Sequence, residues 1–328
     1  MSGAWLLARA AAALAAGTLA VAAWAADPVA DCPPPQPAAQ VDRDPQAGDL
    51  QTRDLGMLWR LEKDGQQGWL YGTLHLGRAA WSRPGPRLSQ ALGDSDLLAL
   101  ELDTGDPETA HAIARAIAAH RATPGAQALP GGLLARLRAL ARAACVDGPW
   151  LAGQPPVLQA VTLTLLSARA LGLDPAFAQE ALLAERARAA GQRVVSLETV
   201  DSQLAALLPA DPAEAEALVR STLGQLESGR MPRQLQRLAG LWADGDLDEL
   251  GRYEQWCGCV ADARDRARLR RLNDDRNPAL ADGIAGLLAS RQRVFAAVGA
   301  LHMTGGQALP RLLAQRGYRV QRVRFAPM

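Results

Sequence analysis

Short apolar runs lie toward the two ends of the chain, and they predict β-strands. Two alternating segments, residues 58–62 and 69–73, flank the turn sequence at 64–68, a pattern typical of a β-hairpin. The remaining predicted strands are residues 97–103, 192–198, 293–299 and 318–324. A sheet assembled from distant parts of the chain is therefore expected.

Long segments between these runs, about 106–192 and 200–291, repeat apolar residues at helical spacing and are rich in Ala, Leu and Arg. Pro and Gly interrupt the pattern and divide it into separate helices. Further helices are predicted over 87–92 and about 306–316. The sequence thus predicts a helix-rich α/β (α+β) fold, with a central mixed β-sheet built from N- and C-terminal strands and covered by helices.

The first 25 residues have the layout of a secretory signal peptide. One positive charge, Arg9, precedes an Ala/Leu/Val-rich run, and a small-x-small pattern predicts cleavage before Ala26. An uncleaved anchor is the alternative, but the run is short for a span of about 20 residues. Residues 26–51, rich in Pro, Ala and Gln, are predicted to be a linker. Residues 52–328 then form a single domain of a periplasmic or secreted protein, with no transmembrane span after signal cleavage.

The net charge indicates which class of partner to expect, and the number of cysteines bears on whether disulfides form. The net charge is +1 and no basic block occurs, so nucleic acid is not an expected partner. An even number of cysteines suits disulfides in an exported protein, although the sequence does not determine their pairing. Cys257-Gly-Cys259 could instead be a metal or redox site, but it is one residue short of C-x-x-C, and structural disulfides are preferred. The cysteines are Cys32, Cys145, Cys257 and Cys259.

One short pattern occurs twice, as Gly72-Thr-Leu-His75 and Gly299-Ala-Leu-His302, each time at the end of a predicted strand. A strand that ends in Gly can turn sharply, and a His three residues later can point into the crevice beyond the strand. A lone G-x-x-H is a weak pattern, and such a His is more often structural, but the repeated context argues against that interpretation. Both ends of the chain are therefore predicted to supply an imidazole to one site. His111 and His120 are predicted to be exposed helix residues.

Carboxylates follow two of the apolar runs. Glu101 and Asp103 close one run, at the strand end where clefts form in α/β sheets, and Glu198 closes another. The helix that follows also needs a cap, so we assign capping to Asp106 and chemistry to Glu101, and we leave Asp103 open. Two imidazoles and a carboxylate could bind a hydrolytic divalent metal, with Glu101 or Glu198 as ligand or general base. In a metal-free alternative, one His activates water while a carboxylate orients it.

Arg276-Asn277 precedes a predicted helix that leads into the strand before His302. The guanidinium of Arg276 could stabilise an oxyanion or hold a substrate carboxylate. An ordinary surface Arg beside an N-cap Asn is the alternative, and the Arg-rich composition favours it.

Together these segments resemble the TraB/GumN family, also called the TraB/PrgY/GumN/Tiki superfamily. The resemblance extends from about residue 55 to residue 323 and rests on the order and spacing of several motifs. It implies a fold akin to the erythromycin-esterase and ChaN-like proteins, with the two G-x-x-H histidines and the first Glu at a shared site. The matching segments are Leu-Trp-Arg-Leu61, Leu-Tyr-Gly-Thr-Leu-His-Leu-Gly77, Leu-Glu-Leu-Asp103, Gly-Leu-Asp174, Val-Val-Ser-Leu-Glu-Thr199 with Gln203, Arg-Asn277, Ala-Val-Gly-Ala-Leu-His302 with Gly305, and Gly317-Tyr318.

Members of the Tiki branch are described as metal-dependent proteases with manganese or cobalt as candidate ions. The resemblance therefore implies an exported hydrolase, and it favours a metal-dependent peptidase acting on a peptide or protein. Carried over to this chain, His75, Glu101 and His302 would bind the divalent metal (Mn, Co or Zn). Glu198 and Arg276 would be supporting catalytic residues.

Two further hypotheses remain open within this resemblance. One is a metal-free, esterase-like hydrolase, and the other is a non-catalytic protein that binds a peptide or, like ChaN-like relatives, haem. The aromatic content of 4% provides few anchors for a hydrophobic ligand. The chain also departs from the family pattern beside the second histidine, where Met303-Thr-Gly305 replaces the more usual Leu-x-Gly.

Overall fold

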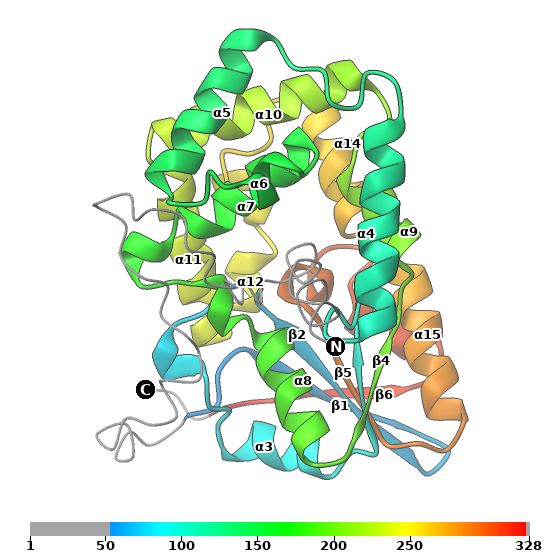
Figure 1. The fold of residues 1–328 in the computed structure, drawn as a ribbon. Coiled ribbons are helices and arrows are strands. Elements are labelled where there is room, and N and C mark those ends of the chain that lie inside the picture. The colour runs from blue at the N-terminus through cyan, green and yellow to red at the C-terminus, as the bar shows by residue number, and fades with distance from the viewer. Residues whose placement is uncertain (1–52, 326–328) are drawn as a thin grey trace. The chain divides into compact units, whose positions relative to one another are not determined.

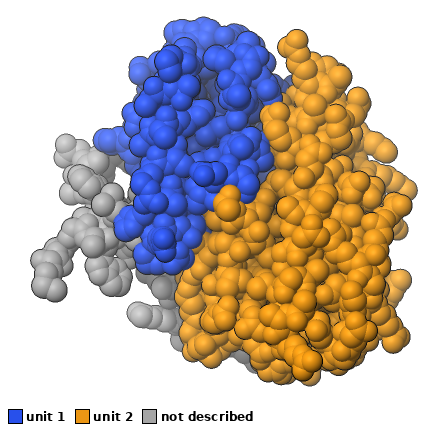
Figure 2. All heavy atoms as spheres, turned by 90° about the vertical axis from the view of Figure 1, so that its right-hand side faces the viewer, with its two compact units in different colours: residues 1–47, 104–176, 200–236 blue, residues 48–103, 177–199, 237–328 orange. Residues whose placement is uncertain are grey.

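A computed structural model describes residues 53–325 of the chain. The predicted signal peptide, the linker at 26–51 and Cys32 lie outside the described residues. The chain forms two compact units, which Figure 2 shows in different colours. Among the described residues, the first unit consists of residues 104–176 and 200–236, and the second of residues 53–103, 177–199 and 237–325. The single domain over 52–328 stays a prediction.

A six-stranded sheet, in the order β4-β3-β5-β2-β1-β6, forms the centre of the second unit (Figure 1). β1 pairs antiparallel with β2 and β6, whereas the β2–β5, β3–β5 and β3–β4 pairs are parallel, so the sheet is mixed as predicted. All six predicted strands are present. Their bounds are β1 (Met57–Lys63), β2 (Gln66–Thr73), β3 (Leu97–Leu100), β4 (Arg193–Ser196), β5 (Val294–Gly299) and β6 (Arg319–Val323).

β1 and β2 form the predicted hairpin. Asp64 and Gly65 join them with φ values of 50° and 77°, the left-handed conformation that a type I′ hairpin turn requires at both central positions. β3 and β5 lie in the interior of the sheet, and almost all their residues are buried. Near-continuous apolar runs of this kind are typical of parallel strands covered on both faces.

Helices of the second unit pack on this sheet. α8 contacts β3 and β4, α15 contacts β2 and β5, and α16 contacts β6. The helices that lie entirely in this unit are η3 (Ala79–Trp81), α3 (Pro86–Gly93), α8 (Gln179–Ala189), α12 (Leu247–Leu250), α13 (Tyr253–Trp256), α14 (Ala263–Leu272), α15 (Asn277–Ala289), η6 (Ala300–Met303) and α16 (Leu309–Gln315). The helix-rich α/β class predicted from the sequence is thus confirmed.

The described residues of the first unit form helices, and Asp106 caps one of them as predicted. The carboxylate of Asp106 accepts a hydrogen bond of 2.8 Å from the backbone N–H of Thr109, and Pro107 occupies the first turn. His111 and His120 lie on the same helix, the first exposed and the second half-buried. The helices are α4 (Pro107–Ala122), α5 (Gly131–Ala143), α6 (Pro149–Ala152), α7 (Pro156–Leu166), η4 (Arg169–Leu171), α9 (Val200–Leu207) and α10 (Pro212–Glu227), while η5 (Pro175–Phe177) and α11 (Arg230–Asp244) have residues in both units.

Two general predictions can be compared with the described part of the chain. No helix within residues 53–325 is both long and apolar enough to cross a membrane. Cys257 and Cys259 form a disulfide, and no cysteine in the same range is free. The sequence leaves the pairing open, and the structure joins these two cysteines to each other.

Candidate functional site

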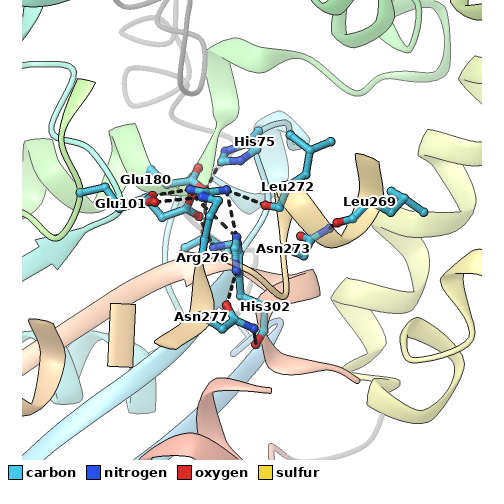
Figure 3. Close-up of polar contacts among 12 residues, drawn as sticks. His75, Glu101, Glu180, Leu269, Leu272, Asn273, Arg276, Asn277 and His302 are labelled. Carbon is cyan, nitrogen blue, oxygen red and sulfur yellow. Dashed lines mark hydrogen bonds and ion pairs between the residues drawn. The ribbon is translucent and has the colours of Figure 1, made fainter. Parts of the chain in front are cut away.

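Side chains that the sequence predicted for one site do come together in the second unit (Figure 3). Strands β2, β3, β4 and β5 run parallel, so their carboxyl ends lie at one edge of the sheet. His75, Glu101, Glu198 and His302 each follow one of these ends by one to three residues, and Arg276 lies at the start of α15. The strands are slightly shorter than predicted, which places both glutamates just beyond them rather than within them.

Arg276 connects the other members of the site. Its Nε donates a hydrogen bond to Glu198 at 2.9 Å. Nη1 donates to the Leu272 carbonyl at 2.8 Å and lies 3.3 Å from Nε2 of His302. Nη2 donates to both Glu101 and Glu198. These contacts use all five N–H groups of the guanidinium. The side chain is only 16% exposed. Arg276 is therefore not the surface arginine of the alternative interpretation.

The carboxylate of Glu101 is buried and held at both oxygens. Oε1 accepts a hydrogen bond of 2.7 Å from the backbone N–H of Gly299, and Oε2 accepts one from Arg276. Burial favours the neutral acid, but the nearby His302 and Arg276 favour the carboxylate and lower the pKa of Glu101 to about 2. Glu101 therefore carries a negative charge throughout the physiological range.

Asn277 fixes the tautomer of His302. The Asn277 amide nitrogen donates to the carbonyl of Gln307 at 2.8 Å and to that of His302 at 3.3 Å, so its oxygen is the atom that faces His302 Nδ1, at 2.5 Å. Nδ1 must then carry the hydrogen, which leaves a lone pair on Nε2 toward Arg276. Burial lowers the pKa of His302 to about 4, so this ring is neutral near pH 7. Asn277 is no N-cap residue, because Arg276 occupies that position.

His75 has a different environment, which the sequence analysis missed. Its Nδ1 lies 2.9 Å from Oε1 of Glu180, in the first turn of α8, and Thr73 donates a hydrogen bond to the same oxygen. The Nδ1 contact is an ion pair without hydrogen-bond alignment, and Oε2 of Glu180 has no hydrogen-bond partner among the described residues. Burial disfavours the imidazolium, but Glu180 outweighs it and raises the pKa of His75 to about 9. Nδ1 itself is buried, but the His75 side chain as a whole is 42% exposed, more than any of the other side chains of the site.

Three of these groups lie close to Gly299, which has no side chain. A Cβ placed on Gly299 would lie 3.1 Å from Oε1 of Glu101, 3.6 Å from Cδ2 of His302 and 3.9 Å from Nε2 of His75. The backbone of Gly299 has φ −49° and ψ 138°, which any residue can adopt. A side chain at this position would therefore crowd Glu101, whereas the backbone conformation itself does not require glycine.

The position of the Arg276 guanidinium determines whether the predicted metal ion fits this arrangement. Oε2 of Glu101 and Nε2 of His302 are 3.9 Å apart, and the guanidinium contacts both atoms. A cation bound to both would lie about 2.0–2.2 Å from each and would have to take the place of this positive group. Within residues 53–325, no three His, Cys, Asp or Glu side chains are arranged to hold a metal ion. As arranged here, the predicted ligands do not fit a divalent metal.

Comparison with known proteins gives one match, which agrees with the family resemblance inferred from the order of the motifs. The model of the TraB/PrgY/gumN family matches residues 57–322. Neither the curated proteins nor the solved structures contain a significant match, so the likeness to erythromycin esterases and ChaN-like proteins stays a prediction. The family match covers most of the chain and both G-x-x-H segments. The chain belongs to the TraB/PrgY/gumN family.

Proposed function

We propose that this family member is a hydrolase of carboxylic amides or esters that activates water without a metal. The observation that carries the proposal is the approach of a carboxylate and an imidazole to Gly299, a residue with no side chain. The carboxylate is the buried one of Glu101, and the imidazole is that of His75. A fixed base and a fixed proton donor that lie this close to one residue are the minimum set for hydrolysis of a carbonyl compound.

The reaction assigns one proton transfer to each group. Glu101 accepts a proton from a water molecule as the water oxygen bonds to the carbonyl carbon of the substrate. His75, which is protonated near neutral pH, donates its Nε2 proton to the departing amine or alkoxide as the bond to carbon breaks. Glu101 then passes its proton to His75 through solvent, which restores both groups. The two pKa values, about 2 for Glu101 and about 9 for His75, keep the first group ionised and the second protonated near pH 7.

Arg276, Glu198 and His302 are positioning residues in this proposal. No N–H of Arg276 remains for a substrate oxygen, because its five donors are used within the site. Its charge keeps Glu101 ionised and fixes the direction of the carboxylate. His302, neutral and only 4% exposed, holds one side of the guanidinium. These roles differ from the substrate contact or metal ligation expected from the sequence.

Chelation separates this proposal from the metal-dependent peptidase that the resemblance implies. The protein would be dialysed against a chelator and assayed on a peptide library and on a panel of activated esters. We expect hydrolysis that survives chelation and falls about 10²–10⁴-fold in Glu101→Gln, the usual contribution of a general base. His111→Asn, an exposed histidine on α4, is the matched control and should retain full activity.

Three outcomes would overturn the proposal. The first is activity that disappears on chelation and returns with manganese, cobalt or zinc, which would restore the metallopeptidase. The second is full activity of Glu101→Gln, because the carboxylate would then not be the base. The third is no hydrolysis of any amide or ester, which would favour a binding role.

A further inference from the structure

The disulfide between Cys257 and Cys259 encloses a single residue, Gly258, between α13 and α14. A disulfide stabilises a fold mainly by closing a loop in the unfolded chain, and this effect is smallest for the shortest loops. The two cysteines are neighbours along the chain in any conformation, so the bond joins no separate elements. Stabilisation of the fold by a cross-link therefore does not explain this disulfide.

The two sulfur-bearing residues differ in accessibility. Cys257 is 0% exposed, whereas Cys259 is only part-buried. The backbone N–H of Cys259 lies 3.0 Å from Sγ of Cys257, and Gly258 between them has φ +59°, a left-handed conformation that glycine adopts at little cost. Cys259 is thus the less buried half of the disulfide, and its backbone N–H is a hydrogen-bond donor to the sulfur of the buried half.

This asymmetry matches the requirements of thiol–disulfide exchange. A thiolate attacks the more accessible sulfur, and the reaction is faster when the departing thiolate is stabilised. Here the accessible half is Cys259 and the departing half is Cys257. An N–H group that points at a sulfur favours its thiolate form.

We propose that the Cys257–Cys259 disulfide is a thiol–disulfide exchange site for small thiols and for cysteines of unfolded chains. The incoming thiolate forms a bond to Sγ of Cys259 while the Cys257–Cys259 bond breaks, and the electron pair remains on Cys257 as a thiolate. A second thiol of the substrate then displaces Cys259, which leaves the protein with two thiols and the substrate with a disulfide. None of the residues of the proposed hydrolase takes part in this exchange.

Adduct mapping on the native, full chain tests the direction of attack. The oxidised protein would be incubated with reduced glutathione, quenched by alkylation and mapped by mass spectrometry. We expect a glutathione adduct on Cys259 and none on Cys257. The disulfide-bonded Cys145 is an internal control that should stay unmodified. No adduct on a folded protein, or an adduct mainly on Cys257, would overturn the proposal.

Two single variants test the asymmetry independently. The remaining thiol in Cys257→Ser should react with a disulfide reagent at least about tenfold faster than the thiol in Cys259→Ser, because only the first is accessible. Equal rates would contradict the assignment. Catalysis itself would be followed as reduction of insulin by dithiothreitol, which the wild-type protein should accelerate and Cys257→Ser/Cys259→Ser should not. If circular dichroism shows that the double variant is unfolded, reduced and alkylated wild-type protein replaces it, and unchanged catalysis by that protein would also overturn the proposal.

Discussion

The substitution Gly299→Ala tests whether the proposed reaction needs room for the attacking water beside residue 299. The added methyl group would lie 3.1 Å from Oε1 of Glu101, tighter than most contacts of a Cβ, and at ordinary van der Waals distances from His302 and His75. It would occupy the volume that the attacking water needs. We expect kcat/KM to fall about 10²-fold or more, which corresponds to about 2.7 kcal/mol of lost transition-state stabilisation.

Stability should respond very differently to the same change. Alanine at a compatible backbone position stabilises a protein by about 0.4–1 kcal/mol, because the unfolded chain loses freedom. The tight contact with Glu101 offsets part of this gain, so the free energy of unfolding should change by less than about 1 kcal/mol. A loss of activity without a loss of stability would therefore identify the space, and not the fold, as the affected feature.

Steady-state kinetics and urea unfolding of the same preparations would measure both quantities. Gly286→Ala on α15 is the matched control, since a Cβ there meets no atom within 4 Å, and it should leave kcat/KM unchanged. Retention of more than about a third of wild-type kcat/KM in Gly299→Ala would refute the reasoning, since a base needs its water within hydrogen-bond reach.

The remaining predictions concern proton transfer and the support of the site. His75 must be protonated to act as the donor, so kcat/KM should stay level near neutrality and decline as pH rises through about 9, which a pH–rate profile would measure. Glu180→Gln removes the charge that raises this pKa, so the decline should move toward the ordinary histidine value of about 6.5. A profile that does not move would show that Glu180 does not raise the pKa of His75. Asn277→Ala should lower the free energy of unfolding by about 2–4 kcal/mol in urea titrations, because it leaves buried polar groups without partners. Asn273→Ala, which loses one part-buried hydrogen bond, is the control, and equal losses would contradict this account.

The strands could be predicted because their apolar runs are short, and four of the six end at glycine or an acidic residue. β3 and β5 are buried on both faces, and such strands differ clearly from the Ala- and Arg-rich helices. Grouping His75, Glu101 and His302 followed from the same runs, because parallel strands bring their carboxyl ends to one edge of the sheet. The site could therefore be located without knowing how the helices pack.

Other features of the site depend on packing that no local pattern encodes. Glu180 lies in a helical segment whose sequence does not distinguish it from other helix acids. It reaches His75 because α8 begins beside the end of β2, where the N–H of Gln179 donates to the carbonyl of Leu74 at 3.1 Å. The role of Asn277 likewise requires the turn of η6, which brings the ring of His302 back to it. Neither contact follows from spacing along the chain.

Arg276 explains why the metal-dependent and metal-free hypotheses could not be separated from the sequence. A divalent ion and a guanidinium do similar electrostatic work in such a site, since each lowers the pKa of carboxylates and orients an imidazole through Nε2. The pattern of two G-x-x-H histidines and a glutamate is compatible with either positive group. What separates them is position, because in this chain the guanidinium contacts Glu101, Glu198 and His302 together. The two histidines and the glutamate can therefore be in place while the positive charge between them comes from Arg276 and not from a metal ion.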